Sequence, residues 1–107
     1  MPFGFGKKAK EDLKEINLKV VFACEAGMGS SAMGASILRD KMKKAGLKVN
    51  VKNYAVTQVP KETDVVVTHK SLSNTVKMRL PEVRVVAVEN FLSSPEYDKL
   101  VDEFSSL

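Results

Sequence analysis

A short apolar run over residues 18–23 leads directly into Cys24 and then into a turn with two glycines and two serines. The run is rich in β-branched residues, which is typical of a buried strand. Apolar residues after the turn recur at helical spacing, so we expect a strand, a glycine-rich turn and a helix in that order. Strands that alternate with helices in this way are typical of α/β proteins with a parallel sheet.

The rest of the chain continues the same alternation of strand and helix patterns. Apolar patterns predict three more strands, over residues 48–52, 65–67 and 83–88. Helical spacing predicts three helices, over residues 31–45, 72–80 and from Pro95 to Phe104. Gly46 is placed to end the first helix, and Ser94 is placed to cap the last. The predicted class is α/β, with helices covering both faces of a small parallel sheet.

Length and composition favour one soluble domain. The chain has 107 residues, of which 44% are hydrophobic and 28% are charged, a balance typical of a globular protein. Residues 1–17 mix glycine, proline and charge, and we expect a flexible leader followed by a folded domain over residues 18–107. No apolar run approaches the ~20 residues that cross a bilayer, and no secretory signal is visible, so we expect no membrane insertion and a cytoplasmic location.

Residue counts bear on possible ligands. One cysteine and one histidine cannot form an internal disulfide or a complete structural zinc site, and no nucleotide-binding motif is complete, so we expect no metal and no cofactor. The formal net charge is +4, with lysine clusters over residues 7–10 and 41–44. We interpret these clusters as solvated surface, and we expect no nucleic-acid partner.

The turn after Cys24 has the composition of a phosphate-binding loop. It consists of Glu25, Ala26, Gly27, Met28, Gly29, Ser30 and Ser31. Glycines let successive N–H groups converge on an anion, and a helix N-terminus favours both phosphate and a thiolate at Cys24. Ser30 and Ser31 could cap the helix or donate hydrogen bonds to the sulfur or to phosphate. The alternative for Cys24 is a small buried hydrophobic residue.

Spacing separates two kinds of cysteine chemistry. Low-molecular-weight cysteine phosphatases use a similar strand, loop and helix with the motif C-x5-R, but Ser30 occupies the arginine position here. Without that guanidinium, hydrolysis lacks its main transition-state stabiliser. A carrier that passes phosphate on therefore fits better, and a phosphatase-like or arsenate-reducing enzyme is the alternative.

Residues 21–35, Val-Phe-Ala-Cys-Glu-Ala-Gly-Met-Gly-Ser-Ser-Ala-Met-Gly-Ala, resemble the signature of phosphotransferase system enzyme IIB domains of the mannitol type. The resemblance extends more loosely over most of residues 18–104. It implies a three-layer, Rossmann-like fold with a four-stranded parallel sheet in the order 2-1-3-4. It also implies that Cys24 accepts phosphate from a phosphohistidine of enzyme IIA and passes it to mannitol held by membrane-embedded IIC, without metal or nucleotide. Such a domain would work at the inner face of the cell membrane.

Four further expectations concern the surroundings of Cys24. Glu25 stands where relatives usually have aspartate, and we expect its carboxylate to point outward or to bind loop N–H groups. His69 follows the third predicted strand, and it could bind incoming phosphate or a partner. Met28 and Met33 could contact partner proteins, although Met33 could equally belong to the core. A regulatory interaction domain with the same fold is a further alternative.

Overall fold

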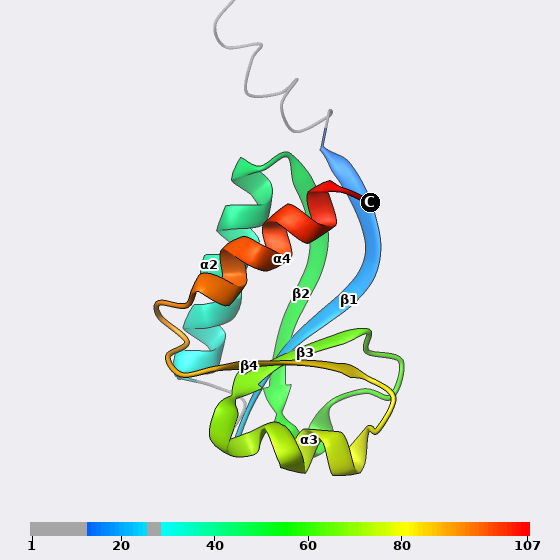
Figure 1. Ribbon diagram of the computed structural model, residues 1–107, viewed down its shortest axis with the longest axis vertical. Coiled ribbons are helices and arrows are strands. Elements are labelled where there is room, and N and C mark those ends of the chain that lie inside the picture. Colours follow the sequence, from blue (N-terminus) through cyan, green and yellow to red (C-terminus); the bar gives the residue numbers. More distant parts are fainter. Residues whose placement is uncertain (1–12, 26–28) are drawn as a thin grey trace, which may run out of the picture.

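The computed structural model describes residues 13–25 and 29–107, which form an α/β protein in three layers (Figure 1). Four strands make one parallel sheet: β1 (Lys14–Cys24), β2 (Leu47–Ala55), β3 (Val65–His69) and β4 (Arg84–Val88). The sheet order is β2-β1-β3-β4, so β1 is central and β2 is an edge strand. The predicted class, the parallel pairing and the strand order are confirmed.

The helices lie where helical spacing predicted them. They are α2 (Ser30–Lys44), α3 (Ser73–Arg79) and α4 (Pro95–Ser105), with short 3-10 turns η1 (Val56–Gln58) and η2 (Lys70–Leu72). Gly46 follows α2 with a φ of 81°, a left-handed conformation that glycine adopts without strain. Ser94 caps α4 by accepting a hydrogen bond from the backbone N–H of Glu96. Both predicted helix boundaries are therefore confirmed.

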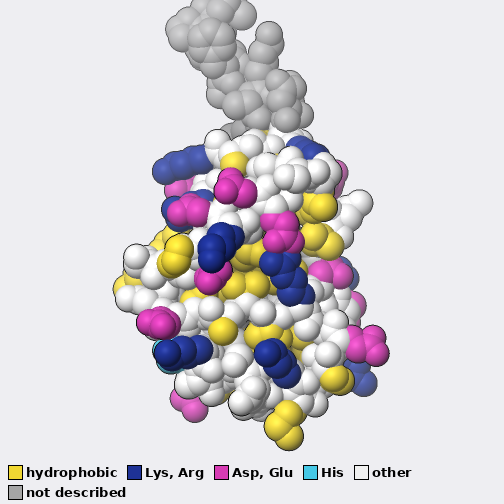
Figure 2. Space-filling model, in the orientation of Figure 1, with side chains coloured by type: hydrophobic (Ala, Val, Ile, Leu, Met, Phe, Trp, Pro, Cys, Tyr) yellow, Lys and Arg dark blue, Asp and Glu magenta, His cyan; other side chains and the backbone are white. Residues whose placement is uncertain are grey.

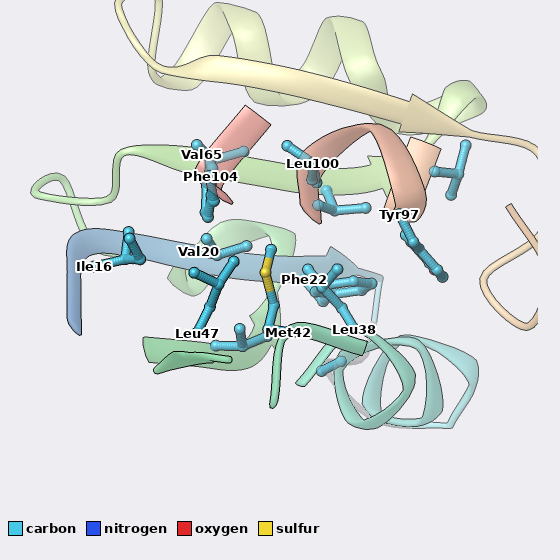
Figure 3. Close-up of a cluster of buried hydrophobic side chains, with 14 of the residues drawn as sticks. Ile16, Val20, Phe22, Leu38, Met42, Leu47, Val65, Tyr97, Leu100 and Phe104 are labelled. Carbon is cyan, nitrogen blue, oxygen red and sulfur yellow. The ribbon is translucent and has the colours of Figure 1, made fainter. Parts of the chain in front are cut away.

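Two hydrophobic clusters lie on opposite faces of the sheet because side chains alternate along β1. Val20 and Phe22 point to the face covered by α2 and α4, whereas Val21 and Ala23 point to the face covered by α3. Figure 3 shows the larger cluster, in which side chains from β1, α2 and α4 meet. This packing holds the carboxyl end of β1 between its neighbouring strands, with helices above and below.

The first strand begins earlier than predicted. β1 starts at Lys14 because residues 14–16 pair with residues 47–49 of β2, before a register shift between Ile16 and Lys19. Ile16 is buried between exposed polar neighbours. This alternation covers too few residues to predict a strand from the sequence. Residues 14–17 are thus part of the sheet and not of a leader. Residues 1–12 of the predicted leader lie outside the described residues.

Basic and acidic side chains intermingle on the surface seen in Figure 2. In the lysine cluster at the end of α2, Lys41 pairs with Asp98 at 3.1 Å and Lys44 pairs with Asp40 at 3.2 Å. These pairs are exposed, so they neutralise local charge and contribute little stability. The arrangement is that of a solvated surface.

Candidate functional site

Cys24 is the last residue of the central strand, and it is half-buried. It lies opposite Ala55 of β2, and the preceding pair on the other side is Ala23 with Thr68 of β3. Thr68 is fully buried, and its hydroxyl donates a 2.9 Å hydrogen bond to the Ala23 carbonyl. This bond, which the sequence pattern did not reveal, ties the end of β1 to β3 immediately before the cysteine.

The start of α2 brings a hydroxyl group to the sulfur. Ser31 is fully buried in the first turn of the helix, and its Oγ lies 2.9 Å from Cys24 Sγ. Either atom can donate when Cys24 is a thiol, but only the hydroxyl can donate to a thiolate. Ser31 is therefore placed to stabilise the ionised form of the cysteine.

The two serines differ, and neither caps the helix. The N-cap of α2 is Gly29, with φ 77° and no capping side chain. Ser30 is the first residue of the helix and is exposed, while Ser31 points inward. The proposed capping role of Ser30 and Ser31 is therefore wrong, because the glycine in its left-handed conformation turns the chain into the helix by itself.

The N-terminus of α2 carries a positive partial charge that no side chain of its own helix offsets. The first turn of α2 contains no acidic residue, whereas the first turn of α4 contains Glu96 and Asp98. The last turn of α2 is basic, which suits the opposite end of the helix dipole. The contrast indicates that the positive end of α2, next to Cys24, is suited to an external anion.

The middle of the predicted loop, Ala26 to Met28, lies outside the described residues. Glu25 and Gly29, on either side of it, are both exposed. Exposure of Glu25 is compatible with a carboxylate that points to solvent. Met33 is 56% exposed, so its alternative assignment to the core is wrong.

His69 ends β3 at the level of Cys24 on the neighbouring strand. Its Nδ1 accepts a 3.1 Å hydrogen bond from the backbone N–H of Ser71 and lies 2.8 Å from Ser71 Oγ. Because a backbone N–H can only donate, Nδ1 carries no proton, and the proton of the neutral ring is on Nε2. Val65 and Val67 share the cluster of Val20 and Phe22, so alternation places His69 on the same face as Cys24.

A buried tyrosine of α4 binds the segment that follows β4. The hydroxyl of Tyr97 donates a 2.6 Å hydrogen bond to the carbonyl of Phe91, and the side chain is fully buried. Burial raises the pKa of Tyr97 to about 12, so the phenol remains a neutral donor at physiological pH. The sequence pattern identified Tyr97 only as part of the apolar face of a helix.

The chain's three arginines all have partners away from Cys24. Arg39 donates to the carbonyl of Val51 at 3.1 Å, and Arg79 donates to the carbonyl of Val59 at 2.8 Å. Arg84 begins β4, at the opposite end of the strand from the cysteine edge, and pairs with Glu103. The guanidinium that a cysteine phosphatase places on phosphate is therefore missing from this site.

Two further features of the described residues bear on other functions. Over residues 13–25 and 29–107, no helix is long and apolar enough to span a membrane. In the same part of the chain, no three His, Cys, Asp or Glu side chains gather in a way that could hold a metal ion.

The fold and the site together define a parallel α/β protein whose only cysteine, at the end of the central strand, faces the positive end of a helix. The family model described as "PTS system, Lactose/Cellobiose specific IIB subunit" matches residues 19–103. The chain therefore belongs to the IIB family of the phosphotransferase system, which confirms the resemblance predicted from residues 21–35.

The similar proteins are named for mannitol, not for lactose or cellobiose. A mannitol-specific EIICB component of the phosphotransferase system from Halalkalibacterium halodurans is 55% identical over 92 residues, which are 86% of this chain and 19% of the relative. Its counterpart from Geobacillus stearothermophilus is 57% identical over 84 residues, 78% of this chain and 18% of the relative. That from Bacillus subtilis is 50% identical over 97 residues, 91% of this chain and 20% of the relative. The chain thus spans about a fifth of the length of these relatives.

Proposed function

We propose that this chain is a phosphoryl carrier in which Cys24 receives phosphate from a phosphohistidine of enzyme IIA and delivers it to mannitol held by IIC. The observation that carries the proposal is the 2.9 Å approach of Ser31 Oγ to Cys24 Sγ at the N-terminus of α2. The hydroxyl and the helix N-terminus both favour the ionised form of the sulfur. The same groups would then hold the phosphoryl oxygens.

The transfer takes place in two displacements at phosphorus. In the first, the Cys24 thiolate attacks the phosphorus of phosphohistidine, and the S–P bond forms. The P–N bond breaks with its electron pair going to the imidazole nitrogen, which takes up a proton from its own protein or from solvent. In the second, a sugar hydroxyl oxygen attacks the same phosphorus, the S–P bond breaks, and the sulfur leaves as a thiolate. The hydroxyl proton passes to a base of the sugar-binding partner or to solvent. A stabilised thiolate serves both steps, as nucleophile and as leaving group.

The positions of the arginines favour a carrier over a phosphatase. Hydrolysis needs strong charge stabilisation of the phosphoryl group during attack by water, which a fixed guanidinium supplies in cysteine phosphatases. Arg39 and Arg79 are bound to backbone carbonyls and Arg84 to Glu103. A thiophosphate held mainly by backbone N–H groups and Ser31 would persist until an acceptor arrives.

His69 is proposed as an auxiliary residue of the transfer. Ser71 fixes the ring so that the Nε2 proton is available to donate. A donor on the strand next to Cys24 can hydrogen-bond a phosphoryl oxygen on the sulfur or a group of the incoming partner. Met33, exposed in the second turn of α2, is proposed to contact those partners. The domain would act on the cytoplasmic side of the membrane, where IIC presents the sugar.

The test is labelling with phosphoenolpyruvate, the general phosphotransferase proteins and a mannitol-type IIA. Wild-type chain and the surface control Ser36→Ala should take up an iodine-labile label, and Cys24→Ser should take up none. Label that persists in Cys24→Ser contradicts the proposal. Rapid hydrolysis of p-nitrophenyl phosphate by the wild-type chain alone would favour the phosphatase instead.

The sugar needs its own experiment, because the family description names lactose and cellobiose while the relatives are mannitol-specific. The labelled chain is mixed with membranes that contain a mannitol-specific IIC, and each sugar is offered in turn. Loss of label to mannitol alone supports the proposal. Loss to lactose or cellobiose through their own IIC proteins, and not to mannitol, would overturn the assignment.

A further inference from the structure

Gly34 lies in the middle of α2 at a point where the helix has no room for a side chain. It is buried, and a Cβ built on it would lie 2.9 Å from Phe22 Cε2, 2.9 Å from the Tyr97 hydroxyl and 3.1 Å from Phe22 Cδ2. Contacts below 3.0 Å are essentially never made by real Cβ atoms. At this point α2 therefore approaches β1 and α4 more closely than any residue other than glycine permits.

The two side chains that face Gly34 are themselves fixed. Phe22 and Tyr97 are both fully buried, and their ring centroids are 5.6 Å apart. Phe22 also contacts Phe91 at 6.0 Å, and the Tyr97 hydroxyl is bound to the Phe91 carbonyl. Neither side chain is the loose end of a flexible group, so a larger residue at position 34 would displace the helix and not its neighbours.

The same approach sets the geometry of the site. Ser31 is one turn before Gly34 on the inner face of α2, and Cys24 is two residues after Phe22 on the same face of β1. The contact between Gly34 and Phe22 and the contact between Ser31 and Cys24 are therefore neighbours along both α2 and β1. A shift of the helix at the first contact moves the Ser31 hydroxyl and the N–H groups of the first turn relative to Cys24 Sγ.

We propose that Gly34 is a positioning residue, which holds the N-terminal turn of α2 against β1 so that Ser31 and the helix N-terminus reach the Cys24 sulfur. The proposal explains why glycine occupies a helix interior, where it costs ~1 kcal/mol relative to alanine. Only the expected effect on phosphoryl transfer rests on the proposed function. The direct consequence of the positioning role, the ionisation of Cys24, can be measured without any partner protein.

The test uses the variant Gly34→Ala and the pH profile of Cys24 alkylation by iodoacetamide. Alanine gains helix propensity, so a loss of function cannot come from a weaker helix and must come from the added methyl group. We expect the midpoint of the alkylation profile to move to higher pH. Phosphoryl uptake from IIA should slow on the order of 10-fold, since sub-ångström misplacement of a reacting group is costly.

A control separates positioning from general destabilisation. Met42 is buried on the same face of α2, three turns beyond Ser31, and Met42→Ala removes core packing without adding bulk near Cys24. It should lower the melting temperature and leave the alkylation profile at its wild-type midpoint. An unchanged profile in Gly34→Ala, or an equal shift in both variants, overturns the proposal.

A compensating variant guards against misfolding of Gly34→Ala. Phe22→Leu removes the ring edge and Tyr97→Phe removes the hydroxyl, which are the two groups that the new methyl group would meet. Both substitutions are combined with Gly34→Ala in one compensated variant, and the pair without Gly34→Ala is also measured. The compensated variant should return the alkylation midpoint toward that of the chain with Phe22→Leu and Tyr97→Phe alone. A compensated variant that folds but keeps the full shift would overturn the proposal. If no chain takes up phosphate but the alkylation midpoints of the variants change as expected, the proposed function is wrong and the positioning role of Gly34 stands.

Discussion

Cys24 Sγ and Ser31 Oγ lie 2.9 Å apart, although seven positions separate the two residues in the chain. The neighbouring Ser30 is exposed at the start of the same helix. A hydrogen bond from a buried hydroxyl to a thiolate is stronger than one between neutral groups, because the acceptor is charged. The two serines are adjacent in the sequence, but we expect them to have different roles.

Ser31→Ala should slow phosphoryl uptake by Cys24, because it removes ~1–3 kcal/mol of transition-state stabilisation, the range for charge-assisted hydrogen bonds. Ser30→Ala is the matched control, and its effect should be much smaller because the Ser30 side chain points to solvent. Rapid-quench measurement of label transfer from phosphorylated IIA gives both rates. Equal effects of the two substitutions would show that the Ser31 contact does not matter for transfer.

Much of this site could be predicted from sequence because strand and helix signals are local. The apolar run before Cys24 and the two glycines after it place a cysteine at the carboxyl edge of a parallel sheet. The distinction between Ser30 and Ser31 could not be predicted, because it depends on which residue begins the helix. With Gly29 as the N-cap, position 31 joins the buried face of α2 together with Ala35, Leu38 and Met42.

Contacts between distant segments were also beyond sequence reasoning. The bond from Tyr97 of α4 to the Phe91 carbonyl depends on the path of the segment that connects β4 to α4. The early start of β1 depends on its pairing with β2, since residues 14–17 are mostly polar and show only one buried side chain, Ile16. In both places tertiary context, and not local preference, determines the structure.

His69 provides a pair of substitutions that separate its two nitrogens. His69→Asn keeps an acceptor near the Nδ1 position, where it can still bind the Ser71 N–H, and loses the Nε2 donor. His69→Gln keeps a donor near the Nε2 position and loses the acceptor. If Nε2 donates to the phosphoryl group, the asparagine variant should transfer phosphate more slowly, on the order of 10-fold, and the glutamine variant should retain more activity.

Single-turnover transfer from phosphorylated IIA, with thermal melting measured in parallel, distinguishes the outcomes for His69. The reverse order, with asparagine active and glutamine impaired, would mean that the ring serves only to hold the turn at Ser71.

Gly46→Ala should lower stability without affecting chemistry. Gly46 has a φ of 81° and open space around its Cα, so a methyl group there meets no atom within 4 Å and causes only backbone strain. That strain costs ~1–2 kcal/mol for a residue with a side chain. Urea denaturation should show this loss, and Gly46→Asn should lose less because asparagine tolerates the left-handed region better. A change in the phosphoryl-transfer rate of either variant would contradict the expectation that this turn is independent of Cys24.

Arg84 and Glu103 connect the start of β4 to the end of α4 through two hydrogen bonds, one of which, from Nη2 to Oε1, is 2.8 Å long. Hydrogen bonding to the Arg84 guanidinium lowers the pKa of the Glu103 carboxyl below its usual value of 4.5. A carboxyl whose pKa is lowered by folding contributes stability above its unfolded pKa, and this contribution disappears as the pH falls through the folded pKa.

Glu103→Gln should therefore be less stable than the wild-type chain at pH 7, and the difference should shrink below about pH 4.5, the unfolded value, and vanish in stronger acid. Both side chains are nearly half exposed, at 48% and 47%, so we expect a difference of only ~0.5 kcal/mol. Urea denaturation of both chains between pH 7 and pH 3 measures it. Glu89→Gln, which removes a longer and more exposed 3.4 Å pair with Lys70, is the control with the smaller expected effect. A difference that stays constant down to pH 3 would show that the glutamine variant is destabilised by altered packing and not by loss of the ion pair.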